Sequence, residues 1–295
     1  MITSYLIIKK QIMKLLFPLA KRFIAGDDIE SMLYNIRQYD LVTINYVGES
    51  AYAPCETKAN LKAYLDLISK LYDLPHREYE ISIKLSQFGQ LPYQWKEPVD
   101  RIVNIVKDIP FIKIKFDMEK ASLIDDTLKF SRCYKDIGIV LQANMERSSV
   151  DIAEVINSQR RVRICKGAYK GDIHNKHKVR AAYLFIVEEL FKSGFFYDKS
   201  YKQELVSLAT HDEYLIQRIK ELAKQYSCQR KFYFEMLFGI RRDLAKRLIG
   251  EGYNVRTYVP YGADWMPYVI RRLMEFKNLR FVVVNTVKEF LSKVR

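Results

Sequence analysis

The sequence predicts an α/β protein folded as a (β/α)8 barrel of the TIM type. Eight short runs rich in β-branched and aromatic residues alternate with longer stretches of helical periodicity. The chain has 295 residues, which is within the range of a single large barrel. A doubly wound parallel sheet is the alternative, but the first predicted strand is not followed by the GxGxxG motif of dinucleotide-binding sheets. The barrel is therefore the preferred interpretation.

The predicted strands follow one another at intervals that suit strand–helix repeats. β-branched and aromatic side chains favour strands, and they concentrate in LVTINYV (41–47), EYEISIKLS (78–86), FIKIKFD (111–117), IGIVLQA (137–143), RVRICKG (161–167), ELVSLAT (204–210), KFYFEML (231–237) and NVRTYVP (254–260). Between them, apolar residues recur with the period of a helix over 59–73, 99–109, 148–159, 179–194 and 240–252. Successive strands begin about 22 to 44 residues apart, which leaves room for one helix in each interval.

No Pro- or Gly-rich linker divides the chain. We therefore expect one domain, with an N-terminal helical segment over 1–36 and the barrel over 37–295. Residues 5–23 form a basic amphipathic pattern, and their apolar runs are far shorter than the ~20 residues that a transmembrane helix needs. The pattern does not match a signal peptide either. This stretch is expected either to pack on the base of the barrel or to rest on an anionic membrane.

Basic residues dominate the charge balance. Lysine and arginine number 49 against 35 aspartates and glutamates, a net charge of +14. Such a surface favours nucleic acid, a membrane or acidic metabolites as partners, or is simply solvated. The cysteines lack the CxxC spacing of a zinc site, which indicates reduced thiols in a cytoplasmic protein. His174 and His177 have no third ligand nearby in sequence, so no metal site is expected.

Residues with functional side chains stand where the predicted strands end. In a (β/α)8 barrel, the loops after the carboxyl ends of the strands build the active site. In chain order these positions hold Gly48-Glu49, Lys84-Leu85-Ser86, Asp117, Gln142, Lys166-Gly167-Ala168-Tyr169, Thr210-His211, Glu235-Met236-Leu237, and Tyr258 with Pro260-Tyr261-Gly262. Polar side chains at all of these ends predict one site at the barrel mouth.

A helix is expected after the eighth strand, from about Asp264, a suitable N-cap residue, through WMPYVIRRLMEF. Tyr268, Arg271, Arg272 and Glu275 share one face of it, because they are offset by three, four and seven positions. Arg271 and Glu275 could form an exposed ion pair of ~0.3 to 0.5 kcal/mol. If this face looks into the barrel mouth instead, the two guanidinium groups would need an anion, and a carboxylate matches their forked donors.

Several motifs together resemble the proline dehydrogenase family over nearly the whole chain. They are KRFIAGDD (21–28), VGES (47–50), IKLS (83–86), RICKGAY (163–169), ATH (209–211), MLFGIR (236–241), YVPYG (258–262) and the tyrosine, arginine and glutamate pattern of the last helix. The resemblance implies a barrel whose last helix lies over the mouth, with its arginines facing the substrate. It also implies oxidation of L-proline to 1-pyrroline-5-carboxylate, the first step of proline catabolism, by hydride transfer to N5 of a flavin. This chemistry needs no protein nucleophile and no metal.

The resemblance also implies roles around the substrate. The catalytic positions would be Lys84, Asp117, Tyr258, Arg271 and Arg272. Both arginines would bind the proline carboxylate, and Glu49 would pair with Arg271 as a gate. Asp117 would orient Tyr258 by a hydrogen bond, and Leu237 would pack against the pyrrolidine ring. Lys84, Tyr258 and Tyr268 would complete the substrate pocket.

FAD is the implied cofactor, and FMN is the alternative. The residues that would hold it are Gln142, Arg163, Lys166, Gly167, Ala168, Tyr169, Thr210, His211 and Glu235. A positive charge at Arg163 near the isoalloxazine would stabilise the anionic reduced flavin and raise its reduction potential. The sequence departs from the family pattern at Lys170, where Trp is frequent, at Asp212, where Asn is frequent, and at Glu235, where Gln is usual.

The implied electron acceptor is a quinone or another acceptor. The expected location is the cytoplasm, with peripheral contact to an anionic membrane. The alternative function is a non-catalytic basic barrel that binds nucleic acid or a membrane surface. A bound flavin that L-proline bleaches would identify the enzyme.

Overall fold

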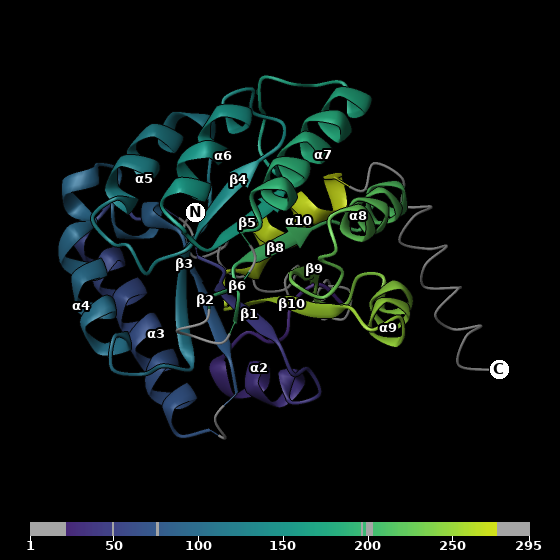
Figure 1. Ribbon diagram of the computed structural model, residues 1–295. Helices are drawn as coiled ribbons and strands as arrows, with labels where there is room; N and C mark the ends of the chain where they lie inside the picture. Colours follow the sequence, from purple (N-terminus) through teal and green to yellow (C-terminus); the bar gives the residue numbers. More distant parts are fainter. Residues whose placement is uncertain (1–21, 49, 75–76, 196, 199–202, 276–295) are drawn as a thin grey trace.

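The computed structural model describes residues 22–48, 50–74, 77–195, 197–198 and 203–275, without the side chains of 197–198, 203–204 and 271–275. Eight parallel strands form a nearly closed barrel, with α3 to α9 around its outside (Figure 1). The strands are β1 (Val42–Tyr46), β2 (Tyr79–Ile83), β3 (Ile112–Phe116), β4 (Ile139–Gln142), β5 (Val162–Cys165), β8 (Val206–Ala209), β9 (Tyr233–Leu237) and β10 (Asn254–Tyr261). Each lies in one of the predicted runs, or extends one by a single residue, so the (β/α)8 prediction is confirmed.

The order of the strands in the sheet is β3-β2-β1-β10-β9-β8-β5-β4, so the first and last barrel strands are neighbours. Between β3 and β4 the ring is joined by Gly138 alone, whose N–H donates to Ile114 O at 3.0 Å and whose carbonyl accepts from Phe116 N at 2.9 Å. A Cβ at this glycine would lie 3.1 Å from Arg161 O and from Lys115 Cε. Close approach of the backbone at the seam therefore favours glycine.

Helices occupy the intervals between strands, including two intervals for which no helix range had been named, and one helix stands before the first strand and one after the last. They are α2 (Ile29–Ile36), α3 (Pro54–Tyr72), α4 (Lys96–Val106), α5 (Ile124–Ser131), α6 (Ser148–Asn157), α7 (Lys176–Ser193), α8 (Glu213–Gln225), α9 (Arg242–Gly250) and α10 (Trp265–Glu275), with 3-10 turns η1 (Leu85–Phe88), η2 (Pro92–Gln94) and η3 (Ala121–Leu123). Local signals fix their ends. Pro54 opens α3, and the Asn175 side chain caps α7 by accepting from the N–H groups of His177 and Lys178. None of the described helices is long and apolar enough to cross a membrane.

A short antiparallel hairpin of β6 (Tyr197–Asp198) and β7 (Gln203–Glu204) precedes β8. It was not predicted, because strands of two residues are too short to show an alternating pattern. Residues 1–21 lie outside the described part of the chain, so the expectations for the basic stretch at the N-terminus stay predictions.

The core consists of two large apolar clusters between strands and helices, one against α2 to α4 and one against α5 to α9. A third and smaller cluster lies at the barrel mouth, where Trp265 and Val269 of α10 pack against Val47, which follows β1, and Ile240, which follows β9. Residues after strands are at the carboxyl end of the barrel. The first half of α10 therefore lies over the mouth, as expected.

Candidate active site

A cavity of about 740 Å³ opens at the carboxyl ends of the strands, a size within the usual range of ligand-binding pockets. Every predicted site residue whose side chain is described lines it: Lys84, Asp117, Gln142, Arg163, Lys166, Gly167, Ala168, Tyr169, Thr210, His211, Glu235, Leu237, Tyr258 and Tyr268. Glu49 and the side chains of Arg271 and Arg272 lie outside the described part of the structure. Their assigned roles stay predictions.

Asp117, directly after β3, accepts hydrogen bonds from several side chains at the inner end of the pocket. Its Oδ1 accepts from Ser82 Oγ at 2.5 Å and from Arg163 Nη1 at 2.6 Å. Its Oδ2 accepts from Tyr258 Oη at 2.7 Å and from Asn45 Nδ2 at 3.4 Å. The hydrogen bond to Tyr258 is the contact expected from the sequence. Both oxygens of this carboxylate therefore accept hydrogen bonds, which fixes its orientation.

Tyr258 is a proton donor to Asp117 and stays protonated. Burial raises the pKa of its phenol well above the usual value, and the negative charge of Asp117 raises it further. Because its proton is directed to Asp117, the phenol oxygen keeps its lone pairs for a donor on a ligand. The guanidinium carbon of Arg163 lies 4.8 Å from the centre of the ring, which fixes the ring from its face.

Arg163, on β5, is a buried and fully paired cation. Its Nε donates to Glu235 Oε2 at 2.9 Å, and its Nη2 lies 2.8 Å from Glu235 Oε1. With Asp117 on Nη1, the guanidinium faces two carboxylates. Burial tends to lower the pKa of Arg163, but Glu235 and Asp117 outweigh it and raise that pKa well above its usual value. The effect expected of a positive charge at Arg163 near the cofactor stays a prediction, and the two carboxylates that face the guanidinium bear on it directly.

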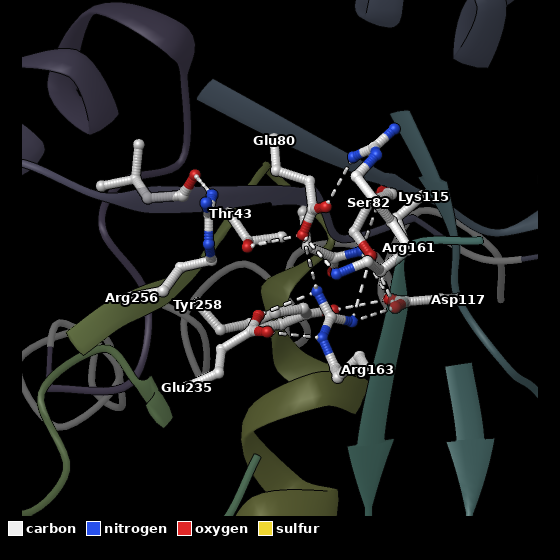
Figure 2. Close-up of polar contacts among 12 residues, drawn as sticks. Thr43, Glu80, Ser82, Lys115, Asp117, Arg161, Arg163, Glu235, Arg256 and Tyr258 are labelled. Atoms are coloured by element: carbon white, nitrogen blue, oxygen red, sulfur yellow. Dashed lines mark hydrogen bonds and ion pairs between the residues drawn. The ribbon is translucent and has the colours of Figure 1, made fainter. Parts of the chain in front are cut away.

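A chain of buried charges continues from Arg163 into the barrel interior (Figure 2). Glu80 of β2 accepts from Lys115 Nζ at 2.7 Å, from Arg161 Nη1 at 3.1 Å and from Thr43 Oγ1 at 3.1 Å. Its Oε2 also lies 3.7 Å from Arg163 Nη2. These cations hold the pKa of the Glu80 carboxyl well below its usual range, against the opposing effect of burial.

Sequence reasoning missed this network, although a signal was present. Glu80 and Ser82 alternate within β2, and Arg161 and Arg163 alternate along the segment that forms β5. Alternate residues of a barrel strand point to the same side, so polar residues in these otherwise apolar runs indicate a polar interior.

His211, after β8, is oriented by a hydrogen bond to the neighbouring strand. Its Nε2 accepts from the backbone N–H of Leu237 at 3.0 Å. An accepting ring nitrogen carries no proton, so a neutral His211 has its N–H on Nδ1. The side chain thereby joins the ends of β8 and β9.

Cations gather at the outer rim of the pocket. Arg180 donates to both oxygens of Asp212, at 2.9 and 2.7 Å, and Lys166 Nζ lies 3.5 Å from Asp212 Oδ2. Burial tends to raise the pKa of Asp212, but these cations lower it overall. Asp212, one of the departures from the family pattern, thus orients two cations. Lys176 and Arg241 also line the rim, and Lys170 is exposed.

Asn144, after β4, organises the loop after β5 and was not singled out from the sequence. Its Nδ2 donates to Tyr169 O at 2.8 Å, and its backbone N–H donates to Lys166 O at 3.0 Å. Gly167 has φ +107, and a Cβ there would lie 2.0 Å from Asn144 Oδ1. Glycine is therefore required by both conformation and space.

The donor set fits a flavin better than a metal. No group of three His, Cys, Asp or Glu side chains able to hold a metal occurs in the described ranges. The cavity is lined instead by polar side chains such as Gln142, Thr210 and Tyr258 beside apolar ones such as Met236 and Leu237, a mixture that suits the polar edge and apolar ring of an isoalloxazine. Burial raises the pKa of the Cys165 thiol, which also lines the pocket, to about 11, so it is protonated and unreactive at neutral pH.

Comparison with known proteins gives a consistent result. The family model for proline dehydrogenase matches residues 31–282. Proline dehydrogenase of Deinococcus radiodurans is 32% identical to this chain, and the alignment covers 92% of this chain and 90% of that protein. Proline dehydrogenase 1 of Bacillus subtilis subsp. natto is also 32% identical, with 92% and 91% covered.

Solved structures share the fold. Proline utilization A of Bdellovibrio bacteriovorus, inactivated by N-propargylglycine, superposes with a TM-score of 0.79 at 20% identity over 93% of this chain. A mutant of proline utilization A from Bradyrhizobium japonicum gives 0.72 at 19% identity over 92%. This chain spans 34% and 32% of the lengths of those two chains, respectively.

Proposed function

This chain belongs to the proline dehydrogenase family, whose members oxidise L-proline with a bound flavin in the first step of proline catabolism. We propose that the pocket at the barrel mouth holds the proline and the flavin together. The observation that carries the proposal is the hydrogen-bonded group of Asp117, Tyr258, Arg163 and Glu235 in the wall of this one cavity. It presents fixed charges and an oriented phenol beside apolar side chains such as Leu237.

Proline lies, in this proposal, between Lys84, Leu237, Tyr258 and Tyr268, under α10. Arg271 and Arg272 bind its carboxylate, and Glu49 pairs with Arg271 to close the site. Leu237 and Tyr268 give the pyrrolidine ring an apolar surround. The oxygen of Tyr258 accepts from the amine N–H, since its own proton is committed to Asp117.

The residues perform orientation and electrostatics, and the flavin when bound supplies the hydride acceptor. Substrate must react as the free amine, and the positive charges of Lys84 and the arginines favour loss of the ammonium proton. Contacts to the carboxylate and the ring of proline align its reactive carbon. Such alignment lowers the activation barrier by up to ~7 to 11 kcal/mol in well-oriented reactions. Product is 1-pyrroline-5-carboxylate.

We propose FAD as the form of the flavin. The pocket continues past Thr210 and His211 to Lys166, Lys176 and Arg180, a group of cations that suits a pyrophosphate. At its far rim Tyr214 is exposed, and the guanidinium carbon of Arg180 lies 4.9 Å from its ring centre. An exposed aromatic next to a guanidinium suits a stacked purine. FMN has no such group to place there.

Electrons pass to a quinone or another acceptor, and the protein acts in the cytoplasm with peripheral contact to an anionic membrane. The chain is a single barrel domain over 37–295 with an N-terminal segment over 1–36.

The test is spectroscopic. Purified protein should show the visible absorption of oxidised flavin and lose it on anaerobic addition of L-proline, while 1-pyrroline-5-carboxylate accumulates and can be trapped with o-aminobenzaldehyde. D-proline is the control. Chromatography of flavin released by heat distinguishes FAD from FMN. Protein that binds flavin but is not bleached by L-proline would overturn the proposed site, and release of FMN alone would overturn the choice of FAD.

A further inference from the structure

Glu235 is the buried carboxylate that binds Arg163 most completely. Its two oxygens lie 2.9 Å from Nε and 2.8 Å from Nη2 of Arg163, along one edge of the guanidinium. Both side chains are buried and both line the pocket. This pair joins β9 to β5 across β8, so no neighbouring-strand register requires it.

Arg163 cannot act on a ligand as a lone cation in this setting. Charges in a poorly solvated interior interact strongly, and a carboxylate in direct contact offsets most of the field of the guanidinium. The wider network of charges is balanced as well, because four cations face four carboxylates: Lys115, Arg161, Arg163 and Arg256 against Glu78, Glu80, Asp117 and Glu235. Replacing Glu235 alone would leave one uncompensated positive charge in the pocket wall.

We propose that Glu235 is a positioning residue that sets the reduction potential of the bound flavin by neutralising Arg163. The inference rests on the function proposed above, because it places the flavin ring beside this pair. Charge near the ring tunes the stability of the anionic reduced flavin. With Glu235 in place, the potential is lower than the one that Arg163 would impose if it were paired with Asp117 alone.

A purely structural role for Glu235 makes a different prediction. If Glu235 only holds the arginine side chain in place, its replacement changes stability and flavin affinity without favouring the reduced over the oxidised flavin. If it neutralises the arginine, a neutral isostere strengthens binding of the reduced, anionic flavin relative to the oxidised form, and the midpoint potential rises.

The experiment is equilibrium reductive titration of the flavin-loaded protein against reference dyes, for wild type and Glu235→Gln. We expect a positive shift that corresponds to at least a tenfold gain in affinity for reduced over oxidised flavin, about 30 mV for two electrons. The dissociation constant for sulfite, an anion that adds to N5, should fall by a similar factor in the same variant. An unchanged potential overturns the inference.

Glu78→Gln is the matched control. Glu78 pairs with Arg256 at the other end of the charge chain and does not line the pocket, so this variant makes the same change in charge farther from the flavin. An equal shift in both variants would overturn a specific role for Glu235. If Glu235→Gln does not fold, Glu235→Asp retracts the carboxylate from Arg163 by one methylene and should give a smaller positive shift; no shift there overturns the inference too. Failure of the wild type to bind flavin would instead overturn the proposed function.

Discussion

Tyr258 and Asp117 are joined by a hydrogen bond of 2.7 Å at the barrel mouth, although 141 residues separate them in the chain. The phenol donates to Oδ2 of Asp117, and Ser82 and Arg163 donate to Oδ1. The bond fixes the direction of the phenol and leaves its oxygen as an acceptor toward the pocket.

Tyr258→Phe should lower kcat/KM for L-proline by on the order of 10- to 150-fold, because a hydrogen bond to a charged group contributes ~1.5 to 3 kcal/mol. Steady-state kinetics with L-proline measure this. Tyr134→Phe is the control, since Tyr134 also donates to a carboxylate, Asp100, at 2.7 Å but does not line the pocket. Equal losses in the two variants would show that the effect of Tyr258 is general destabilisation.

Arg271→Met and Arg272→Met should each raise KM for L-proline by on the order of 10- to 150-fold, from loss of a charge-assisted bond to the substrate carboxylate worth ~1.5 to 3 kcal/mol. The flavin should stay bound, with an unchanged visible spectrum. Arg218→Met removes the same charge from an exposed position on α8 and should leave KM unchanged. Near-normal saturation by proline in both helix variants would contradict the assignment of α10 as the carboxylate-binding element.

Gly167→Ala should weaken flavin binding by at least about tenfold, since forcing a side chain into this backbone conformation costs of order 1 to 3 kcal/mol and its Cβ would meet Asn144 at 2.0 Å. Flavin titration into the apoprotein measures the affinity. Gly194→Ala is the control: its φ is also positive, at +69, but a Cβ there meets nothing within 4 Å and it lies at the end of α7. If both variants bind flavin normally, the loop after β5 does not hold it.

Lys115 should titrate near pH 8. Burial lowers its pKa from 10.5 to about 8, and Glu80 only partly opposes this. Between these two values the unfolded chain binds more protons at this residue than the folded protein, so its contribution to the free energy of unfolding rises with pH. Urea unfolding of wild type and Lys115→Met at about pH 7 and about pH 9.5 should show the difference shifting in favour of wild type at the higher pH. A pH-independent difference would contradict the lowered pKa.

Membrane association should depend on anionic lipid and on salt. Residues 5–23 carry a basic amphipathic pattern, and each basic residue near an anionic surface contributes about 1 kcal/mol. Sedimentation with anionic and neutral vesicles at low and high ionic strength measures this. Equal, negligible pelleting with both vesicle types at low salt would rule the idea out. Binding that survives deletion of residues 1–20 would instead place it on the folded surface.

Local sequence patterns were sufficient to predict the strands, most of the helices and the location of the site at the barrel mouth. The eight strand runs were recognisable because β-branched and aromatic residues cluster in short segments, and helical periodicity fills the intervals. In a parallel barrel all carboxyl ends of the strands lie on one side, so residues scattered from Lys84 to Tyr258 had to converge. The described ones do line one cavity.

The family resemblance implied the hydrogen bond between Asp117 and Tyr258, but the partners of the other buried polar side chains could not be read from the sequence. Glu235 was visible as a departure from the family pattern, but its contact with Arg163 depends on strand order, tilt and the direction of both side chains. The role of Asn144 could not be predicted for the same reason, since its side-chain amide donates to a loop that follows a different strand. Periodicity reports which residues are inside, because burial is a property of each position. Which buried charge meets which is a property of pairs far apart in the chain, and only the closed barrel brings them within hydrogen-bonding distance.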